Sequence, residues 1–215
     1  MKRIKGKKQV VNMYITVTVN LMINLWRDFM NKTKRKIFET SMKLFAEKGY
    51  DGTSIEEITS VVGVAKGTLY YHFSSKEEIF NFLVEEGMNL LKNSITIKTN
   101  KQEKYIDKLR AIILIQIKII AKYENFMSIV LSEIWGNSSR SKTCQNSLND
   151  YLEIIKDVLS QGIEKKEIKK VDVEIVADEL FGMVCTSLYY IKNNDLIVEK
   201  LFREIDRTII RNLSI

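Results

Sequence analysis

The stretch that decides the fold is residues 49–80, which read GYDGTSIEEITSVVGVAKGTLYYHFSSKEEIF. Ser54 and Glu57 form an S-x-x-E capping box, in which the hydroxyl and the carboxylate each satisfy a backbone N–H at the start of a helix. Thr53 and Glu56 offer the same pattern one residue earlier. In either register, the spacing predicts that a helix begins here.

A second short helix is expected directly after the first. Gly63 ends the first helix after about two turns, because glycine readily adopts the left-handed conformation found at helix ends. Within residues 65–73, Ala65, Leu69 and Phe73 stand four apart and share one side of the next helix. The polar residues on its other side are Lys66, Thr68 and Tyr71. Two short helices joined by a glycine turn are typical of the helix-turn-helix, whose second helix enters the major groove of DNA.

Longer helices are expected on both sides of this pair. Apolar residues recur at three- and four-residue spacing from Lys32 up to Gly49, which predicts a helix with one buried face. Ser75 and Glu78 form another capping box, and apolar residues at helical spacing follow them. Residues 93–101 lose this spacing, so we expect a linker there.

The composition favours an all-α fold. The 215-residue chain has 45% hydrophobic residues, nine glycines and no proline, so it can bury a core but lacks the turn residues that β-folds need. Its net charge is +7, but residues 1–29 hold six basic residues against one acidic residue, which leaves only +2 for the rest. The total charge therefore does not by itself predict nucleic-acid binding.

Sites for metals and catalysis are not expected. Cys144 and Cys185 lie far apart in sequence, and neither belongs to a C-x-x-C pair or lies near the only histidine, His72. This spacing predicts neither a metal site nor a disulfide framework, and it fits the reducing cytoplasm. The sequence contains no H-E-x-x-H motif, nucleophile elbow or phosphate-binding loop, so we expect neither an enzyme nor a cofactor.

The amino-terminal segment differs from the rest of the chain. An apolar run at residues 10–25 follows the basic stretch KRIKGKK, an order that imitates a signal peptide. However, no A-x-A-like cleavage site follows, three asparagines interrupt the run, and its 16 residues fall short of the ~20 that span a membrane. We interpret residues 1–29 as an atypical tail outside the native protein, with translation starting at Met30. A membrane anchor at residues 10–25 is the alternative.

Residues 31–91 resemble the amino-terminal domain of tetracycline-repressor (TetR) family regulators. The GY turn, the TS helix start, the G-V-x-K-G-T-L-Y-Y-H-F segment and the following S-K-E occur together and in order. The resemblance implies a helix-turn-helix at about residues 54–73 within a three-helix DNA-binding domain at residues 30–92. A fourth helix would join that domain to a helical effector-binding and dimerisation domain at residues 93–215, which resembles the family only in helix pattern.

The resemblance also implies a DNA-binding surface made of base contacts flanked by phosphate contacts, which together fix register and specify sequence. The base contacts would be Lys66, Gly67 and Thr68, and the phosphate contacts Thr53, Ser54, Tyr70, Tyr71, His72 and Lys76. Without the family pattern, a lone histidine would be packed or solvated, and the lysines would be ordinary surface residues. Tyr70 would pack its ring partly into the core while its hydroxyl reaches outward to a contact.

In the second half, residues 105–123 are hydrophobic on nearly all sides, so we expect other helices to surround this one. Those helices are expected at about residues 126–135, 141–165, 173–192 and 196–213. Gln116 would then bond a neighbouring helix or point toward a ligand. The candidates for an effector pocket, which would equally suit a plain core, are Gln116, Tyr123, Phe126, Met127, Trp135 and Met183.

The last two expected helices carry apolar stripes. The resemblance implies that this terminal pair meets its copy across a two-fold axis as a four-helix bundle. Two recognition helices reading a palindromic site also require a dimer. The interface candidates are Leu180, Val184, Leu188, Leu201, Phe202, Ile205 and Ile209.

These patterns together predict a cytoplasmic DNA-binding transcription regulator. We expect a repressor that binds double-stranded operator DNA as a homodimer and is released by a small-molecule effector. The alternative is a helical binding or scaffold protein without sequence-specific DNA binding.

Overall fold

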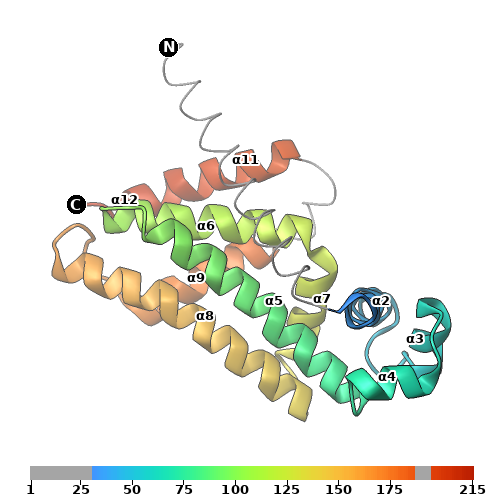
Figure 1. Cartoon of the computed structure of the whole chain (residues 1–215). Helices are drawn as coiled ribbons and strands as arrows, with labels where there is room; N and C mark the ends of the chain where they lie inside the picture. The colour runs from blue at the N-terminus through green and yellow to red at the C-terminus, as the bar shows by residue number, and fades with distance from the viewer. Residues whose placement is uncertain (1–30, 187–194) are drawn as a thin grey trace.

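The helices form two groups (Figure 1). The computed structural model describes residues 31–186 and 195–215, and the regular structure of this part of the chain is helical. One group contains α2 (Lys32–Lys48), α3 (Ile55–Val62) and α4 (Lys66–His72). The other is a bundle of α5 (Lys76–Thr99), α6 (Tyr105–Lys122), α7 (Glu124–Glu133), α8 (Ser139–Glu164), α9 (Val173–Thr186) and α11 (Asp195–Ile205). The expected all-α architecture is confirmed.

Some predictions concern parts of the chain that the structure does not describe. These are the tail at residues 1–29, with the anchor alternative at residues 10–25, and the interface residue Leu188. Among the described residues, no helix combines the length and the apolar character needed to cross a membrane.

The helix ends of the first group lie where the sequence patterns place them. Ser54 Oγ accepts a hydrogen bond from the Glu57 N–H at 3.1 Å, so the later of the two registers is used. Ser75 Oγ caps α5 in the same way, at 3.0 Å. Gly49 and Gly63 end α2 and α3 with φ of 75° and 76°, in the left-handed region that favours glycine. Each of these boundaries depends on a local interaction.

The core of the first group draws on all of its helices and on the start of α5. Ile37 of α2, Ile58 of α3, Leu69 of α4 and Phe80 of α5 are all buried. Ala65, expected on the inward face of the recognition helix, is instead exposed. Its backbone is extended, with φ −69° and ψ 151°, because it precedes the first helical residue as the N-cap.

Helix α5 continues to Thr99, so the predicted linker at residues 93–101 is wrong. Leu91, Ile95 and Thr99 stand four apart and are buried where α5 packs against α6 and α8. The Thr99 hydroxyl also donates to Ile95 O at 3.1 Å. β-Branched residues have lower intrinsic helix propensity, but tertiary packing overrides this weak preference. The two groups are therefore joined by one unbroken helix.

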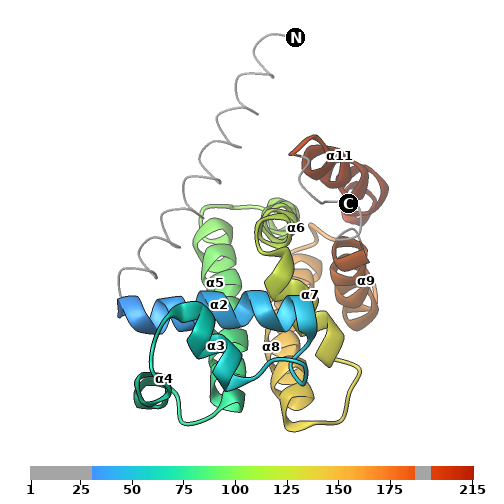
Figure 2. The same ribbon diagram turned by 90° about the vertical axis from the view of Figure 1, so that its right-hand side faces the viewer.

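Helix α6 lies at the centre of the bundle, as its all-round hydrophobicity predicts. It packs against α5, α8, α9 and α11. In Figure 2 it is seen nearly end-on, between α5 on one side and α9 and α11 on the other. Nine of its 18 residues are buried, including Gln116, and all of the others except Lys122 are half-buried.

The carboxyl-terminal helix is irregular near its end. After α11 the chain forms a π-helical turn, η1 (Asp206–Ile210), and then α12 (Arg211–Leu213). The Asp206 carboxylate accepts hydrogen bonds from Arg110 Nε at 2.7 Å and from Arg211 Nε at 3.0 Å. Since Arg110 belongs to α6, this cluster holds the terminal helix against the centre of the bundle.

Candidate nucleic-acid interface

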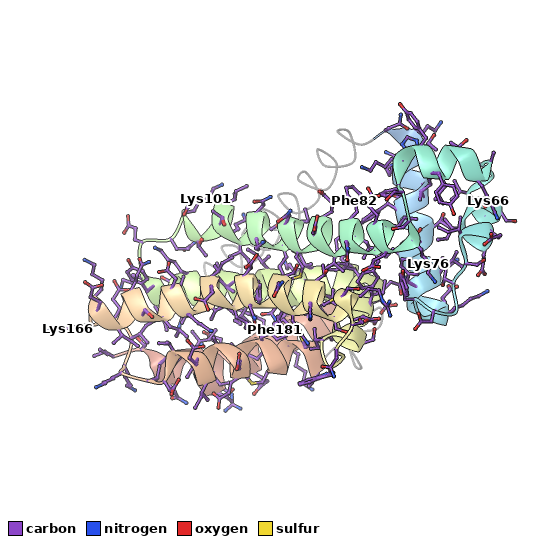
Figure 3. The ribbon with its side chains drawn as sticks, turned by 90° about the horizontal axis from the view of Figure 1, so that it is seen from below. Lys66, Lys76, Phe82, Lys101, Lys166 and Phe181 are labelled. Atoms are coloured by element: carbon purple, nitrogen blue, oxygen red, sulfur yellow. The ribbon has the colours of Figure 1, made fainter. Side chains whose placement is uncertain are left out.

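Helix α4 turns its apolar side inward and its polar side outward. Leu69 and Phe73 are buried, whereas Lys66, Thr68 and Tyr71 are exposed, the tyrosine to 85%. Figure 3 shows Lys66 at one extreme end of the molecule, beyond the start of α5. The orientation predicted for these five residues is confirmed. The polar side of α4 is therefore open to a large partner.

Gly67 adds free space to this surface. The residue is exposed, and a Cβ built on it would meet none of the described atoms within 4 Å. No neighbour in this part of the protein therefore requires a glycine here. The space over the first turn of α4 allows a partner to approach the backbone closely.

Lys66 is engaged in an ion pair on this surface. Its Nζ contacts Glu56 Oε1 in the first turn of α3, and the two side chains are 54% and 62% exposed. The hydrogen bond to Lys66 lowers the pKa of Glu56, and the same bond raises the pKa of Lys66. The adjacent Glu57 pairs instead with Lys48 of α2. The Glu56–Lys66 pair was not predicted, although both residues were expected in the first turns of neighbouring helices, which was a usable signal.

The two hydroxyl residues before α3 have different surroundings. Thr53 is 1% exposed, and its Oγ1 donates to Gly49 O at 2.9 Å. Ser54 is exposed, and its Oγ accepts from a backbone N–H. A hydroxyl that accepts in this way can still donate its proton to an outside acceptor. Of these two residues, Ser54 is the one that presents its hydroxyl at the surface.

Lys76 points back into the protein. Its Nζ donates to Tyr50 O and to Thr53 O, both at 2.8 Å, and lies 4.1 Å from the centroid of the Tyr50 ring. Figure 3 shows this lysine where α5 meets the first group. Its charge therefore ties the turn between α2 and α3 to the start of α5.

The aromatic residues at the end of α4 extend the exposed surface. Tyr70 is 51% exposed, and His72 is half-buried. The rings of Tyr71 and His72 meet edge to face, with centroids 5.1 Å apart. Tyr71 and His72 therefore border the side of the helix that carries Thr68, whereas Tyr70, two residues from Thr68, lies on another side.

A contact from the second half of the chain braces this unit, and no sequence pattern indicated it. The guanidinium carbon of Arg140, in the first turn of α8, lies 3.8 Å from the centroid of the Tyr50 ring. Its Nη2 lies 3.8 Å from Asp51 Oδ2. Beside it, Ser139 Oγ donates to Glu77 Oε1 at 2.5 Å. The start of α8 therefore touches both the turn after α2 and the first turn of α5.

Gln116 is bonded within the bundle. Tyr151 OH of α8 donates to Gln116 Oε1 at 2.8 Å, and Gln116 Nε2 donates to Phe181 O of α9 at 3.4 Å. Burial raises the pKa of Tyr151 well above its usual value, so the phenol stays a proton donor. Of the two alternatives that the sequence left open, the contact with neighbouring helices is the one observed.

The other candidates for the effector pocket lie in different environments. Those inside the bundle or partly covered by it are Tyr123, Phe126, Met127 and Met183. The Phe126 ring packs so closely on Gly87 of α5 that a Cβ there would come within 2.4 Å of it. Trp135 is 88% exposed, because it follows the end of α7 where the chain turns toward α8. It therefore lies at the surface of the protomer and not in its interior.

The predicted interface residues that the structure describes lie on the expected helices, but several face the core of the protomer. Leu180 and Val184 of α9 and Ile205 of α11 are buried. Half-buried residues packed against that core are Leu201, Phe202 and Ile209. The outer side of α9 instead presents Ile175, which is 57% exposed. The apolar stripes thus serve packing within the protomer first.

A short helix, a glycine turn and an outward-facing second helix, braced on a helical bundle, define a helix-turn-helix protein with a helical second domain. The sequence matches the profile of bacterial regulatory proteins of the tetR family over residues 37–83, and that of a tetracyclin repressor-like C-terminal domain over residues 102–189. A solved Clostridium perfringens protein, described as a putative fatty acid metabolism regulator, is 34% identical with a TM-score of 0.76. The match covers 84% of this chain and 99% of that one. The chain therefore belongs to the tetR family of bacterial regulatory proteins.

Two further proteins are similar over smaller parts or at lower identity. IcaR of Staphylococcus aureus, the negative transcriptional regulator of the biofilm operon icaADBC, is 42% identical over 76 residues. That match covers 35% of this chain and 41% of IcaR, so the chain spans less than half the length of this curated relative. FadR of Bacillus subtilis, solved in complex with stearoyl-CoA, is 22% identical with a TM-score of 0.69, covering 84% of this chain and 97% of FadR. The last similarity is one of fold.

Proposed function

We propose that this chain is a transcriptional repressor that binds a palindromic operator as a homodimer and is released by a small-molecule effector. The observation that carries the DNA-binding part is the orientation of α4. Its apolar residues Leu69 and Phe73 anchor it, while Lys66, Thr68 and Tyr71 face outward. A helix held in this way can enter the major groove with its first residues against the base edges.

Within this surface, Lys66, Gly67 and Thr68 read bases, since lysine and threonine both form hydrogen bonds with base edges. Ser54, Tyr70, Tyr71 and His72 contact phosphates and fix the register of the helix. The two remaining candidates, Thr53 and Lys76, support this surface from behind. Their polar atoms bond backbone carbonyls of the α2–α3 turn.

The domain division proposed is a DNA-binding domain at residues 30–92 and an effector-binding and dimerisation domain at residues 93–215. Helix α5 crosses this boundary as one helix. A dimer is proposed because two recognition helices about one DNA turn apart, or a small multiple of it, read a palindromic site. The outer sides of α9 and α11 are the proposed contact between the two copies. The partly covered Leu201, Phe202 and Ile209 of this terminal region would complete their burial there.

The proposed effector is a fatty acid or its coenzyme A thioester. The support is that the Clostridium perfringens relative is described as a putative fatty acid metabolism regulator and that FadR is solved with stearoyl-CoA. The buried residues of α6 are aliphatic except for Gln116, which forms a polar pair with Tyr151 inside the bundle. An apolar environment with one polar group suits an acyl ligand. No catalytic step is proposed, and the site of action is the cytoplasm.

The test is an electrophoretic mobility shift with the DNA upstream of the chain's own gene, repeated with increasing stearoyl-CoA. Sequence-specific retardation that stearoyl-CoA reverses is the expected result. Absence of specific retardation would favour the alternative, a helical binding or scaffold protein. Specific retardation that no acyl ligand alters would refute the effector and leave the DNA-binding function standing.

A further inference from the structure

A negative charge lies beside the residue that reads the bases. Glu56 and Lys66 occupy the first turns of α3 and α4, and their side chains form an ion pair while both remain largely exposed. The carboxylate therefore shares the outward surface that meets DNA, where phosphates would repel it. A favourable interaction with the amino-terminal end of α3 can explain an acidic residue in this turn. It cannot explain why the carboxylate binds Lys66.

We propose that Glu56 competes with DNA for Lys66 and thereby limits the affinity of the chain for its operator. The inference rests on the proposed function. On random DNA, Lys66 can gain only a phosphate contact, and freeing it would leave the Glu56 carboxylate unpaired beside a polyanion. On the operator, a guanine edge offers Lys66 two acceptors, N7 and O6, in a fixed geometry.

The balance between the two DNA classes follows from the strengths of these contacts. An exposed ion pair contributes little, and salt weakens it further. A matched base contact is stronger, so the operator can break the pair, whereas random DNA gains too little to do so. The operator complex therefore bears the full cost of breaking the pair, whereas the random complex keeps the pair and forgoes only a weaker phosphate contact. The carboxylate thus lowers affinity for the operator more than affinity for random DNA.

The neighbouring residue provides a matched control. Glu57 lies in the same turn of α3 and pairs with a lysine, but its partner is Lys48 of α2. Glu56→Gln and Glu57→Gln therefore remove the same charge from the same helical turn. They differ in whether the base-reading lysine is released.

The experiment measures the affinity of the full chain for the operator fragment and for a random duplex of equal length, over a series of salt concentrations. Glu56→Gln should tighten binding to the random duplex by about threefold and make its logarithmic salt dependence steeper by about 0.9, the effect of one additional phosphate contact. Affinity for the operator should rise by more than this, because the operator complex no longer bears the cost of breaking the pair, so the ratio of operator affinity to random affinity should also rise. In a Lys66→Gln background, the same Glu56 change should lose most of its effect.

Three results would overturn the inference. These are a gain of Glu56→Gln on the operator that does not exceed its gain on the random duplex, an equal change in Glu57→Gln, or a full effect of Glu56→Gln without Lys66. A wild-type chain that binds both duplexes equally would instead contradict the proposed function. Thermal unfolding of each variant verifies that the fold is retained.

Discussion

At the scale of single residues, Gly67 separates the needs of the fold from those of DNA binding. A Cβ at this position meets none of the described atoms within 4 Å, and alanine favours a helix over glycine by up to about 1 kcal/mol. Gly67→Ala should therefore raise the free energy of unfolding slightly. It should also weaken operator binding, because the methyl group occupies the space where the backbone approaches DNA.

Chemical unfolding and operator affinity, measured on the same Gly67→Ala sample, check both parts. A loss of stability would show that the glycine serves the fold. Unchanged affinity would show that DNA does not approach this turn of α4.

The sequence indicated the outward residues of α4 but not the roles of all their neighbours. Lys66, Thr68 and Tyr71 could be placed because helical spacing sets which side each occupies. The surroundings of Thr53 and Lys76 could not be predicted. Their partners are backbone carbonyls whose directions depend on how the α2–α3 turn folds.

At the scale of elements, helix starts were predictable and one helix end was not. Ser54 and Ser75 start α3 and α5 by local hydrogen bonds, so the residues alone located these starts. The end of α5 at Thr99 depends on burial against α6 and α8. Sequence spacing does not contain that information, and the low helix propensity of β-branched residues pointed the other way.

The contact between α8 and the α2–α3 turn leads to a prediction for Arg140. Arg140→Gln removes the guanidinium from the face of the Tyr50 ring and from beside Asp51, contacts that together contribute roughly 1 to 2 kcal/mol. Amide hydrogen exchange in residues 50–53 should therefore become faster, while exchange in α6 stays unchanged. The control is Lys142→Gln, which removes a charge from an exposed position two residues further along α8. Equal exchange in both variants would show that α8 does not brace the helix-turn-helix.

The cluster around Asp206 predicts a dependence of stability on pH. Burial acts to raise the pKa of Asp206, but hydrogen bonds from Arg110 and Arg211 outweigh it and lower the pKa overall. The carboxylate therefore stabilises the fold above its usual pKa of about 3.9, and this stabilisation is lost as the pH falls through the lowered value. Asp206→Asn should cost roughly 1 to 3 kcal/mol at pH 7.

Denaturant unfolding between pH 3 and pH 7 measures this contribution. The difference between wild type and Asp206→Asn should shrink toward the acid end. A difference that is constant over the whole range would mean that the charge of Asp206 does not hold the terminal helix against α6.

At the scale of the whole molecule, the sequence predicted the architecture better than the surfaces of the second half. The hydrophobicity of α6 correctly placed it at the centre of a helical bundle. Periodicity alone could not separate residues that face the protomer's core from residues that face a second copy. Leu180, Val184 and Ile205 are buried within the protomer, whereas Trp135 is exposed.

Regulation is also a property of the whole molecule. The proposed dimer has one shape that fits the operator and another that does not, and an effector can shift it only through a difference in its affinity for these two shapes. Changing the ratio of their populations from 1:99 to 99:1 needs about 5.5 kcal/mol of preference. Among the described residues, the bundle is joined to the helix-turn-helix by α5, by the packing of α2 against α7, and by the contact of Arg140 with Tyr50. An effector bound around α6 would act through connections of this kind.

The central claim is that α4 reads bases with its outward side. Its most direct test compares Thr68→Ala with Tyr71→Phe for affinity to the operator and to a set of operators with single base-pair changes. Thr68→Ala should lose roughly 1 to 3 kcal/mol on the operator and its preference at one base pair, whereas Tyr71→Phe should weaken all sequences alike. Equal losses from both variants on every sequence would contradict the claim.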